Sequence, residues 1–326
     1  MTVTSEKLLS THFWKGQVLV AGGQIHNEFD RNNSNVGNLM NVAPITSCRA
    51  CKSKNLIPVF SLGGLYVSNF VGSDDEMGPK IPLELVLCDV SRDGCGLLQL
   101  RHTTPRDLLY KRYWYKSGIS SIIRNDLLDI VGKTERMVKL DDGDMVVDIG
   151  CNDGTLLRFY QNKKLFLVGF EPAANLVKEA ELGTSRIFNT YFNYADFRKE
   201  FSDRKARIIT AISMFYDLDD PNQFMSDIVE MLDKNGVFII QQNYLPMMLE
   251  WNAVDNICHE HLAYYSLLTL ERLLARYNLE VFDVELNDIN GGSFRTYIRF
   301  EGSEIKQTGE AKVRLKRLRA NEQKMR

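Results

Sequence analysis

The middle of the chain alternates between short apolar runs and amphipathic stretches. The apolar runs at residues 145–149, 166–170, 208–214 and 236–242 have the length of buried strands rather than of helices. The stretch at 224–232 has the apolar spacing of a helix. Strands that alternate with helices form parallel sheets, so this pattern predicts an α/β domain with a mostly parallel central sheet.

Further elements are predicted on both sides of these runs. Residues 280–286 and 294–300 alternate apolar and polar side chains, and the Asn-Gly-Gly-Ser segment at 290–293 predicts a hairpin that ends the sheet. Residues 267–277 predict an amphipathic helix. Another helix leads into the first strand of the sheet, with apolar positions at Ile119, Ile122, Ile123, Leu127, Leu128 and Val131.

The turn after the first apolar run contains Gly150 and Gly154, and the second run ends on Glu171. Glycines let a backbone approach a ligand closely, and a carboxylate at the end of the second strand can accept both hydroxyls of a ribose. The spacing lacks the G-x-G-x-x-G turn that holds a pyrophosphate. S-adenosylmethionine (SAM), a nucleoside without a phosphate, therefore fits better than a dinucleotide; a nucleotide-type fold without cofactor is the alternative.

Polar side chains beside this turn extend the predicted cofactor site. Carboxylate and amide oxygens there can accept hydrogen bonds from the ammonium group of the methionine moiety. The residues predicted to bind SAM are Asp148, Gly150, Asn152, Asp153, Gly154, Glu171 and Ser213.

Four of the six cysteines form two pairs early in the chain. The first pair is a C-x-x-C, whereas six residues separate the members of the second pair, which requires a longer loop. In a reducing compartment such pairs predict a tetrahedral structural zinc site, with buried unligated thiols as the alternative. The predicted ligands are Cys48, Cys51, Cys88 and Cys95, and the distant Cys151 and Cys258 are not expected to take part.

Composition narrows the class of protein. A chain of 326 residues with 44% hydrophobic and 25% charged residues is typical of soluble globular proteins with two or three domains. A net charge of −2 and a pI near 6.3 argue against nucleic acid as a partner, and the basic run at 312–319 is expected to be a solvated helix face. No apolar run approaches the roughly 18 residues of a membrane span, and no leader is recognised, so the cytoplasm is the expected compartment.

The segment from Asp255 to Ser266 concentrates further reactive side chains. His259 and His261 bracket Glu260, directly after a predicted strand and loop. Such a cluster can supply a general base near neutral pH together with a group that tunes it. A metal site is disfavoured because the segment is not H-E-x-x-H and no further histidine is near, and a structural hydrogen-bonded cluster is the alternative.

The order of motifs over residues 45–320 resembles the SAM-dependent sugar C-methyltransferases of deoxysugar biosynthesis. The resemblance implies an N-terminal zinc-binding domain, a Rossmann-like methyltransferase domain with a seven-stranded, mostly parallel sheet, and a C-terminal lobe. It also implies a nucleotide-linked 4-keto-6-deoxysugar as the small-molecule substrate. The motifs are Cys48-x-x-Cys51, Cys95-Gly-Leu-Leu-Gln-Leu100, Tyr113-Trp-Tyr-Lys-Ser117, Ile149-Gly-Cys-Asn-Asp-Gly-Thr-Leu-Leu157, His259-Glu-His-Leu-Ala-Tyr-Tyr-Ser266 and Gly291-Gly-Ser-Phe-Arg295.

The resemblance and the local patterns together predict four regions. Residues 1–43 are expected to be a poorly ordered extension, 44–104 the zinc-binding module and 105–300 the methyltransferase domain. A helix is predicted to open after Thr104-Pro105. Residues 301–326, with a charged helix from 310, are expected to begin a C-terminal region that is truncated here.

The resemblance implies a catalytic set as well. His261 would remove the proton next to the ketone, Glu260 would orient the substrate or the base, and Tyr113 or Tyr115 would donate to the developing oxyanion. His259 belongs to the same cluster, and Tyr216 is expected to compensate for donors that the chain lacks. The predicted catalytic residues are His261, Glu260, His259, Tyr113, Tyr115 and Tyr216.

The chain departs from the family pattern at the acceptor side. Cys258 stands where those enzymes have a tyrosine, and Phe215-Tyr216-Asp217 stands where they have a histidine. An O- or N-methyltransferase on a nucleotide sugar or a related polar metabolite is therefore one alternative, and an inactive SAM-binding or interaction protein is another. A contact to a diphosphate is assigned to four basic residues, with solvated surface charge as the alternative: Arg295, Lys111, Arg112 and Lys116.

Overall fold

The structure is a computed structural model, and it describes residues 39–67 and 78–325. The prediction for residues 1–43 therefore falls largely outside the described residues. Within the described part, Leu39 forms a parallel bridge with Lys80, and Pro44 forms an antiparallel bridge with His102. These residues lie against the small sheet that carries the cysteines.

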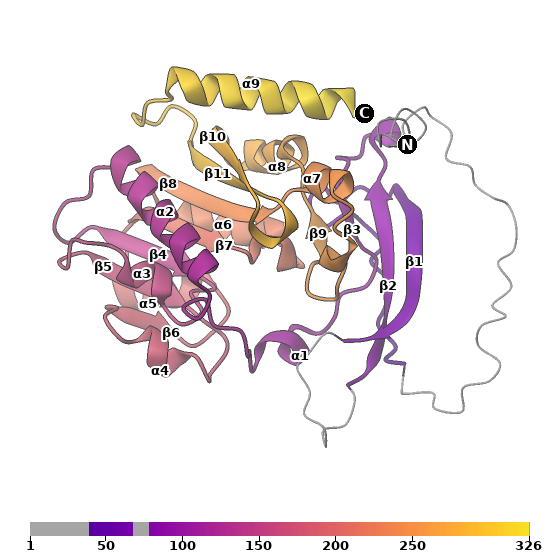
Figure 1. Ribbon diagram of the computed structural model, residues 1–326, viewed down its shortest axis with the longest axis horizontal. Coiled ribbons are helices and arrows are strands. Elements are labelled where there is room, and N and C mark those ends of the chain that lie inside the picture. Colours follow the sequence, from indigo (N-terminus) through magenta and orange to yellow (C-terminus); the bar gives the residue numbers. More distant parts are fainter. Residues whose placement is uncertain (1–38, 68–77, 326) are drawn as a thin grey trace, which may run out of the picture.

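A seven-stranded sheet with the order β10-β11-β8-β7-β4-β5-β6 forms the centre of the larger unit (Figure 1). β11 runs antiparallel to both of its neighbours, and the other strands are parallel to one another. The strands are β4 (Met145–Ile149), β5 (Phe166–Phe170), β6 (Arg186–Phe188), β7 (Ala206–Ile212), β8 (Leu232–Asn243), β10 (Leu279–Asn287) and β11 (Ser293–Phe300). The predicted fold class, the mostly parallel sheet and the closing hairpin are confirmed.

Helices cover both faces of this sheet because its strands carry apolar side chains on both sides. Met145, Val147 and Ile149 of β4 belong to one core cluster, whereas Val146 belongs to the other. The first cluster packs against α5, α6 and α8, and the second against α2 and α3. The helices of this unit are α2 (Ser121–Met137), α3 (Thr155–Arg158), α4 (Val177–Ala180), α5 (Tyr194–Phe201), α6 (Pro221–Met231), α7 (Leu245–Glu250) and α8 (Leu267–Leu274).

The buried face of α2 contains only some of the apolar positions of the predicted helix. Leu127, Ile130 and Val131 are buried, but Ile119, Ile122 and Leu128 are 79%, 68% and 47% exposed. The helix begins only after Ser120, whose side chain accepts the N–H of Ile123, so Ile119 lies outside it. The buried stripe continues instead through Thr134, whose hydroxyl donates to the carbonyl of Ile130. The predicted helix is confirmed, and only Ile119 was wrongly assigned to it.

A second, four-stranded sheet carries the cysteine module and has the order β1-β2-β3-β9. Its strands are β1 (Leu56–Tyr66), β2 (Lys80–Cys88), β3 (Leu98–Leu100) and β9 (Ala263–Tyr264). β9 follows the His-Glu-His segment in sequence but pairs with β3, where Tyr264 lies opposite Leu98 and Ala263 opposite Gln99. The later part of the chain therefore contributes a strand to the small sheet, which the sequence did not predict. α1 (Arg106–Tyr110) leads from one unit to the other, as expected after Pro105.

The last helix, α9 (Gly309–Lys324), lies along β10 and α8 (Figure 1). Its buried Glu322 accepts hydrogen bonds from the Tyr244 hydroxyl at 2.6 Å and from the N–H groups of Leu267 and Leu268 at the start of α8. A buried carboxylate therefore joins α9 to the first turn of α8. None of the helices in the described ranges has the length and apolar character that crossing a bilayer requires.

Candidate active site and zinc centre

A cavity of about 870 Å³ lies along the carboxyl edge of the large sheet. The loops after β4, β5, β7 and β8 line it from one side, and the segments around residues 103–117 and 255–262 line it from the other. In doubly wound sheets ligands bind at this edge, because the loops there diverge. The cavity has the volume of a site for a cofactor together with a second small molecule.

Gly150 and Glu171 shape one end of this cavity. Gly150 has a φ of +71°, and a Cβ atom there would lie 3.3 Å from Met214. Glu171 is 5% exposed, and its two oxygens accept the N–H groups of Asn152 at 2.8 Å and Ala173 at 2.7 Å. A carboxylate offers about four acceptor sites, so each oxygen keeps one for a ligand hydroxyl. This geometry fits the ribose of SAM.

We predict that Glu171→Ala weakens the binding of S-adenosylhomocysteine (SAH) by about 10- to 150-fold, since a hydrogen bond to a charged group contributes roughly 1.5–3 kcal/mol. Titration calorimetry of the purified chain measures this change. Glu171→Gln is the matched control, because it retains one side-chain acceptor and is expected to lose less. SAH binding that is equally tight in the alanine variant would contradict the assignment.

Asp148 and Ser213 also line the cavity. Asp148 is 4% exposed and its Oδ1 accepts the Thr210 hydroxyl at 2.6 Å. Burial raises the pKa of Asp148 to about 7. A cation bound beside it, such as an ammonium group, would lower that pKa again and favour the ionised carboxylate. Ser213 has a φ of +54°, and its N–H donates to the carbonyl of Gln241.

Asp153 and Gly154 lie outside the cavity, in contrast to the prediction. The carboxylate of Asp153 accepts the N–H groups of Gly118 at 2.8 Å and Thr155 at 3.1 Å. Gly154, with a φ of +76°, begins α3 and lies close to the backbone of Ala180. Both residues shape the loop, because the turn directs their atoms toward α3 instead of toward the cavity.

Asn152 lines the cavity and also organises the segment that crosses it. Its Oδ1 accepts the N–H of Ser117 at 3.0 Å, and its Nδ2 donates to the carbonyl of Tyr115 at 3.0 Å. Tyr113 and Tyr115, which both line the cavity, are thereby held above the glycine turn. The glycine-containing loop and the segment that carries Tyr113 and Tyr115 are therefore joined by hydrogen bonds through Asn152.

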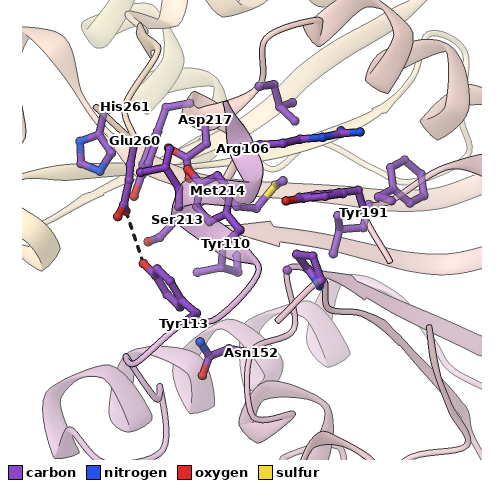
Figure 2. A pocket seen from close by; sticks show the side chains of 18 of the residues that line it. Arg106, Tyr110, Tyr113, Asn152, Tyr191, Ser213, Met214, Asp217, Glu260 and His261 are labelled. Atoms are coloured by element: carbon purple, nitrogen blue, oxygen red, sulfur yellow. Dashed lines mark hydrogen bonds between the residues drawn. The ribbon is translucent and has the colours of Figure 1, made fainter. Parts of the chain in front are cut away.

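His261 lines the opposite end of the cavity with its imidazole oriented by the backbone (Figure 2). Its Nδ1 lies 2.8 Å from the carbonyl oxygen of Asn256. Since a carbonyl only accepts, Nδ1 carries the proton and Nε2 keeps a lone pair. Burial lowers the pKa of His261, and the Tyr216 ring packs edge-on at 4.3 Å between centroids. This is the arrangement of a neutral general base.

Glu260 lies beside His261, and its Oε2 accepts the Tyr113 hydroxyl at 3.5 Å (Figure 2). Burial raises the pKa of Glu260. His259, in contrast, is 2% exposed and points out of the cavity, where its Nε2 donates to the carbonyl of Ile81 in β2 at 3.0 Å. The prediction of His259 as a catalytic residue is corrected: it joins the cluster to the cysteine module.

The structure adds cavity residues that sequence reasoning missed. Asp217 and Tyr110 face Glu260 and Tyr113, while Gln241 donates its side-chain N–H to Asp126 at 2.5 Å elsewhere in the lining. The position of Asp217 just after a central strand was the signal available for it. Asp126 and Tyr110 gave no such signal, because they come from helices whose packing on the sheet brings them to its edge.

Arg295 does not reach the cavity, so its predicted diphosphate contact is wrong. It is 2% exposed and forms ion pairs with Asp126 and Asp129 at 2.8 Å. Lys116 pairs with Glu179 at 2.6 Å. Among the lysines and arginines that the structure describes, Arg106 alone lines the cavity, and it packs 4.0 Å above the Tyr191 ring.

The four predicted zinc ligands converge in the cysteine module. The Sγ atoms of Cys48, Cys51, Cys88 and Cys95 all lie within 4.8 Å of one another. The Cys95 N–H and the Gln99 side chain donate to Cys88 and Cys48 at 3.3 and 3.2 Å, as expected around thiolate ligands. A short helix (Val90–Arg92) accommodates the longer second spacing. Four sulfurs with such donors fit a structural zinc ion.

Side chains around the cysteines also reach the large unit. Arg49, which is 3% exposed, pairs with Asp219 at 3.2 Å just after the β7 loop. Arg272 and Arg276 donate to the carbonyls of Cys95 and Ala50. The cysteine module therefore contacts the large unit at two places, the loop after β7 that lines the cavity and the end of α8.

Comparison with known proteins agrees with this arrangement. Residues 123–284 match a family described as "Methyltransferase domain", and residues 48–110 match one described as "Putative zinc binding domain". The curated protein "C-methyltransferase NovU" of Streptomyces niveus is 30% identical over 257 residues, which are 77% of this chain and 60% of NovU. The chain thus spans about 60% of the length of that relative.

Solved structures with low similarity include methyltransferases and a related fold. The plantazolicin methyltransferase BamL with bound SAH is 12% identical, with a TM-score of 0.42 over 56% of this chain and 86% of BamL. The [4+2]-cyclase SpnF is 15% identical, with a TM-score of 0.42 over 59% of this chain and 88% of SpnF. The two family matches agree with the predicted SAM-dependent methyltransferase domain and with the four-cysteine zinc-binding module.

Proposed function

We propose that this chain, which carries a SAM-dependent methyltransferase domain joined to a zinc-binding module, methylates a carbon next to the ketone of a nucleotide-linked 4-keto-deoxysugar. The observation that carries the proposal is His261, a neutral imidazole with its Nδ1 bonded to Asn256 and its other nitrogen available in the cavity. The similarity to a C-methyltransferase supports the same chemistry.

The residues at the Gly150 end would hold the cofactor. Glu171 would accept the ribose hydroxyls, Gly150 would let the backbone approach, and Asp148 would contribute a carboxylate toward the ammonium group. When bound, SAM supplies an electrophilic methyl group. The residues at the Gly150 end would hold SAM in the same cavity as His261, where the acceptor is expected.

The acceptor carbon must first lose a proton, because a C–H bond is not nucleophilic. His261 would take that proton on Nε2, and the electron pair of the C–H bond would become the double bond of an enolate. Glu260 and Tyr113, hydrogen-bonded to one another, would position the sugar. The enolate carbon is then the nucleophile that accepts the methyl group.

Incubation of the chain in heavy water with a nucleoside-diphosphate-linked 4-keto-6-deoxyhexose tests this proposal. We expect the protein to catalyse exchange of deuterium into the carbon next to the ketone, measured by NMR, and to transfer a labelled methyl group to that carbon when SAM is added. Methyl transfer to oxygen or nitrogen without exchange would reject C-methylation. Confirmed turnover of any kind would reject a binding-only protein.

One observation favours an amine acceptor as the second candidate. Nine carboxylates line the cavity, from Asp126, Asp148, Glu171, Asp217, Asp219, Asp220, Asp227, Asp255 and Glu260. Arg106 is the one arginine in this lining, and Asp126, Asp219 and Asp220 pair with cations outside it, so six carboxylates remain without a cationic partner among the described residues. An excess of negative charge attracts a cationic group, which His261 could deprotonate for N-methylation.

A further inference from the structure

Asp217 occupies the acceptor end of the cavity without an assigned role. It ends the short 3-10 helix Phe215–Asp217 that follows β7, and it lines the cavity wall next to Glu260 (Figure 2). Its Oδ1 is completely buried and has no hydrogen-bond partner among the described residues. A buried polar oxygen of this kind costs free energy unless a ligand completes it.

Two of the other protic groups at this end already have partners. The single hydrogen of the Tyr113 hydroxyl is directed at Glu260, and the Nδ1 hydrogen of His261 is directed at Asn256. Cys258 does not line the cavity. The Tyr110 hydroxyl is buried without a hydrogen-bond partner among the described residues, so Tyr110 and Asp217 remain as donors for an oxygen that develops negative charge next to His261.

The surroundings of Asp217 favour its protonated form. Burial and the negative charge of Glu260 hold the pKa of Asp217 well above its ordinary value, with the Tyr110 side chain opposing this shift. The titratable groups that face it are Glu260 and Cys258 from the loop before β9, Tyr264 from β9, Tyr110 from α1, Tyr113, and its neighbour Tyr216. All are acids, and no cation stands among these groups. Two carboxyls in one dry site share a proton, and Tyr113 stabilises the charge on Glu260.

We propose that Asp217 acts as a neutral carboxylic acid that donates a hydrogen bond to the enolate oxygen of the acceptor. This assignment rests on the proposed C-methylation. His261 takes the α-proton, the C–H electron pair forms the carbon–carbon double bond, and the carbonyl π-electrons move to oxygen, which accepts the hydrogen bond. The proton stays on Asp217; after methyl transfer the ketone re-forms, and His261 releases its proton to water.

Two substitutions of Asp217 separate donation from a structural role. Asp217→Leu removes the donor at similar volume and is expected to slow the deuterium exchange of the 4-keto sugar by about 100-fold or more. Asp217→Asn keeps an N–H donor and is expected to stay within about tenfold of the unaltered chain. Asp203→Asn, the same change at an exposed carboxylate outside the cavity lining, is the matched control and is expected to keep the unaltered rate. SAH binding by calorimetry verifies that each variant is folded.

The pH profile is the second readout. Because the neutral acid is the active form, the exchange rate falls as the pH rises through the pKa of Asp217, and Asp217→Asn lacks this alkaline fall. The ¹³C carboxyl shift of Asp217, assigned by its loss in the asparagine variant, is expected to be that of a protonated acid at pH 7.

The outcomes distinguish this assignment from the proposed function. An ionised Asp217 at pH 7, a folded leucine variant with unaltered exchange, or an alkaline fall retained in the asparagine variant overturns the role of Asp217 alone. If the unaltered chain catalyses no exchange at all, the proposed function fails, and the role of Asp217 fails with it.

Discussion

Replacing His261 by asparagine is expected to lower the rate of α-carbon deuterium exchange by roughly 100- to 10,000-fold, the contribution of a positioned general base. An asparagine side chain can retain the hydrogen bond that Nδ1 donates to Asn256, but it offers no basic nitrogen in place of Nε2. SAH binding is expected to change little, because Glu171 and Gly150 lie at the other end of the cavity.

The pH dependence of the unaltered chain provides an independent measurement. The base acts in its neutral form, and burial lowers the pKa of His261 below its ordinary value. The rate should therefore remain high below pH 6.5 and fall only as the pH drops through that lowered pKa. His259→Asn is the control: its imidazole lies outside the cavity, so the acid limb should persist. Exchange at an unaltered rate in folded His261→Asn would refute the assignment of the base.

Removal of zinc is expected to abolish exchange and methyl transfer while SAH binding persists within about threefold. The ion would join Cys48 and Cys51 to Cys88 at the end of β2 and to Cys95 in the loop before β3, and these two strands belong to the sheet that also contains β9. β9 pairs with β3, and His259 donates to β2, so loosening this sheet displaces the neighbouring Glu260 and His261. The cofactor side lies on the large sheet and depends on different contacts.

A chelator titration followed by metal analysis, calorimetry with SAH and the exchange assay measures this separation. Readdition of zinc should restore exchange, whereas magnesium, a hard cation that prefers oxygen ligands, should not. Equal loss of SAH binding and exchange would show that the zinc module supports the whole fold instead of the acceptor side. Protein purified without chelators that contains no zinc would contradict the four-cysteine site.

Local patterns account for what could be predicted. The strands β4, β5 and β7 and the second half of β8 are apolar runs of strand length, and their alternation with helices specifies parallel pairing without knowledge of distant contacts. The three-residue β6 was not predicted. The glycine turn followed by Glu171 predicted the loop that approaches the cavity, because backbone conformation there depends on adjacent residues. The cysteine pairs were predicted by their spacing, since a zinc ion needs four donors at short range.

The local patterns did not predict the direction in which individual side chains point. Asn152 and Asp153 are neighbours, yet only Asn152 lines the cavity. His259 and His261 are two residues apart, yet they lie on different sides of the loop. Arg295 was predicted to contact a diphosphate, but it is buried among carboxylates of α2. In each case the decision depends on partners more than 30 residues away in sequence.

The amino-acid order by itself determined the fold class, the nucleoside-type turn and the four sulfur ligands, because these depend on periodicity and short spacing. Only the tertiary structure decided which polar side chains meet in the cavity. Pairing of β9 with β3 turns His261 inward and His259 outward, and packing of the short helix after β7 places Asp217 beside Glu260. Such contacts between distant segments set the direction of each side chain, and no local pattern encodes them.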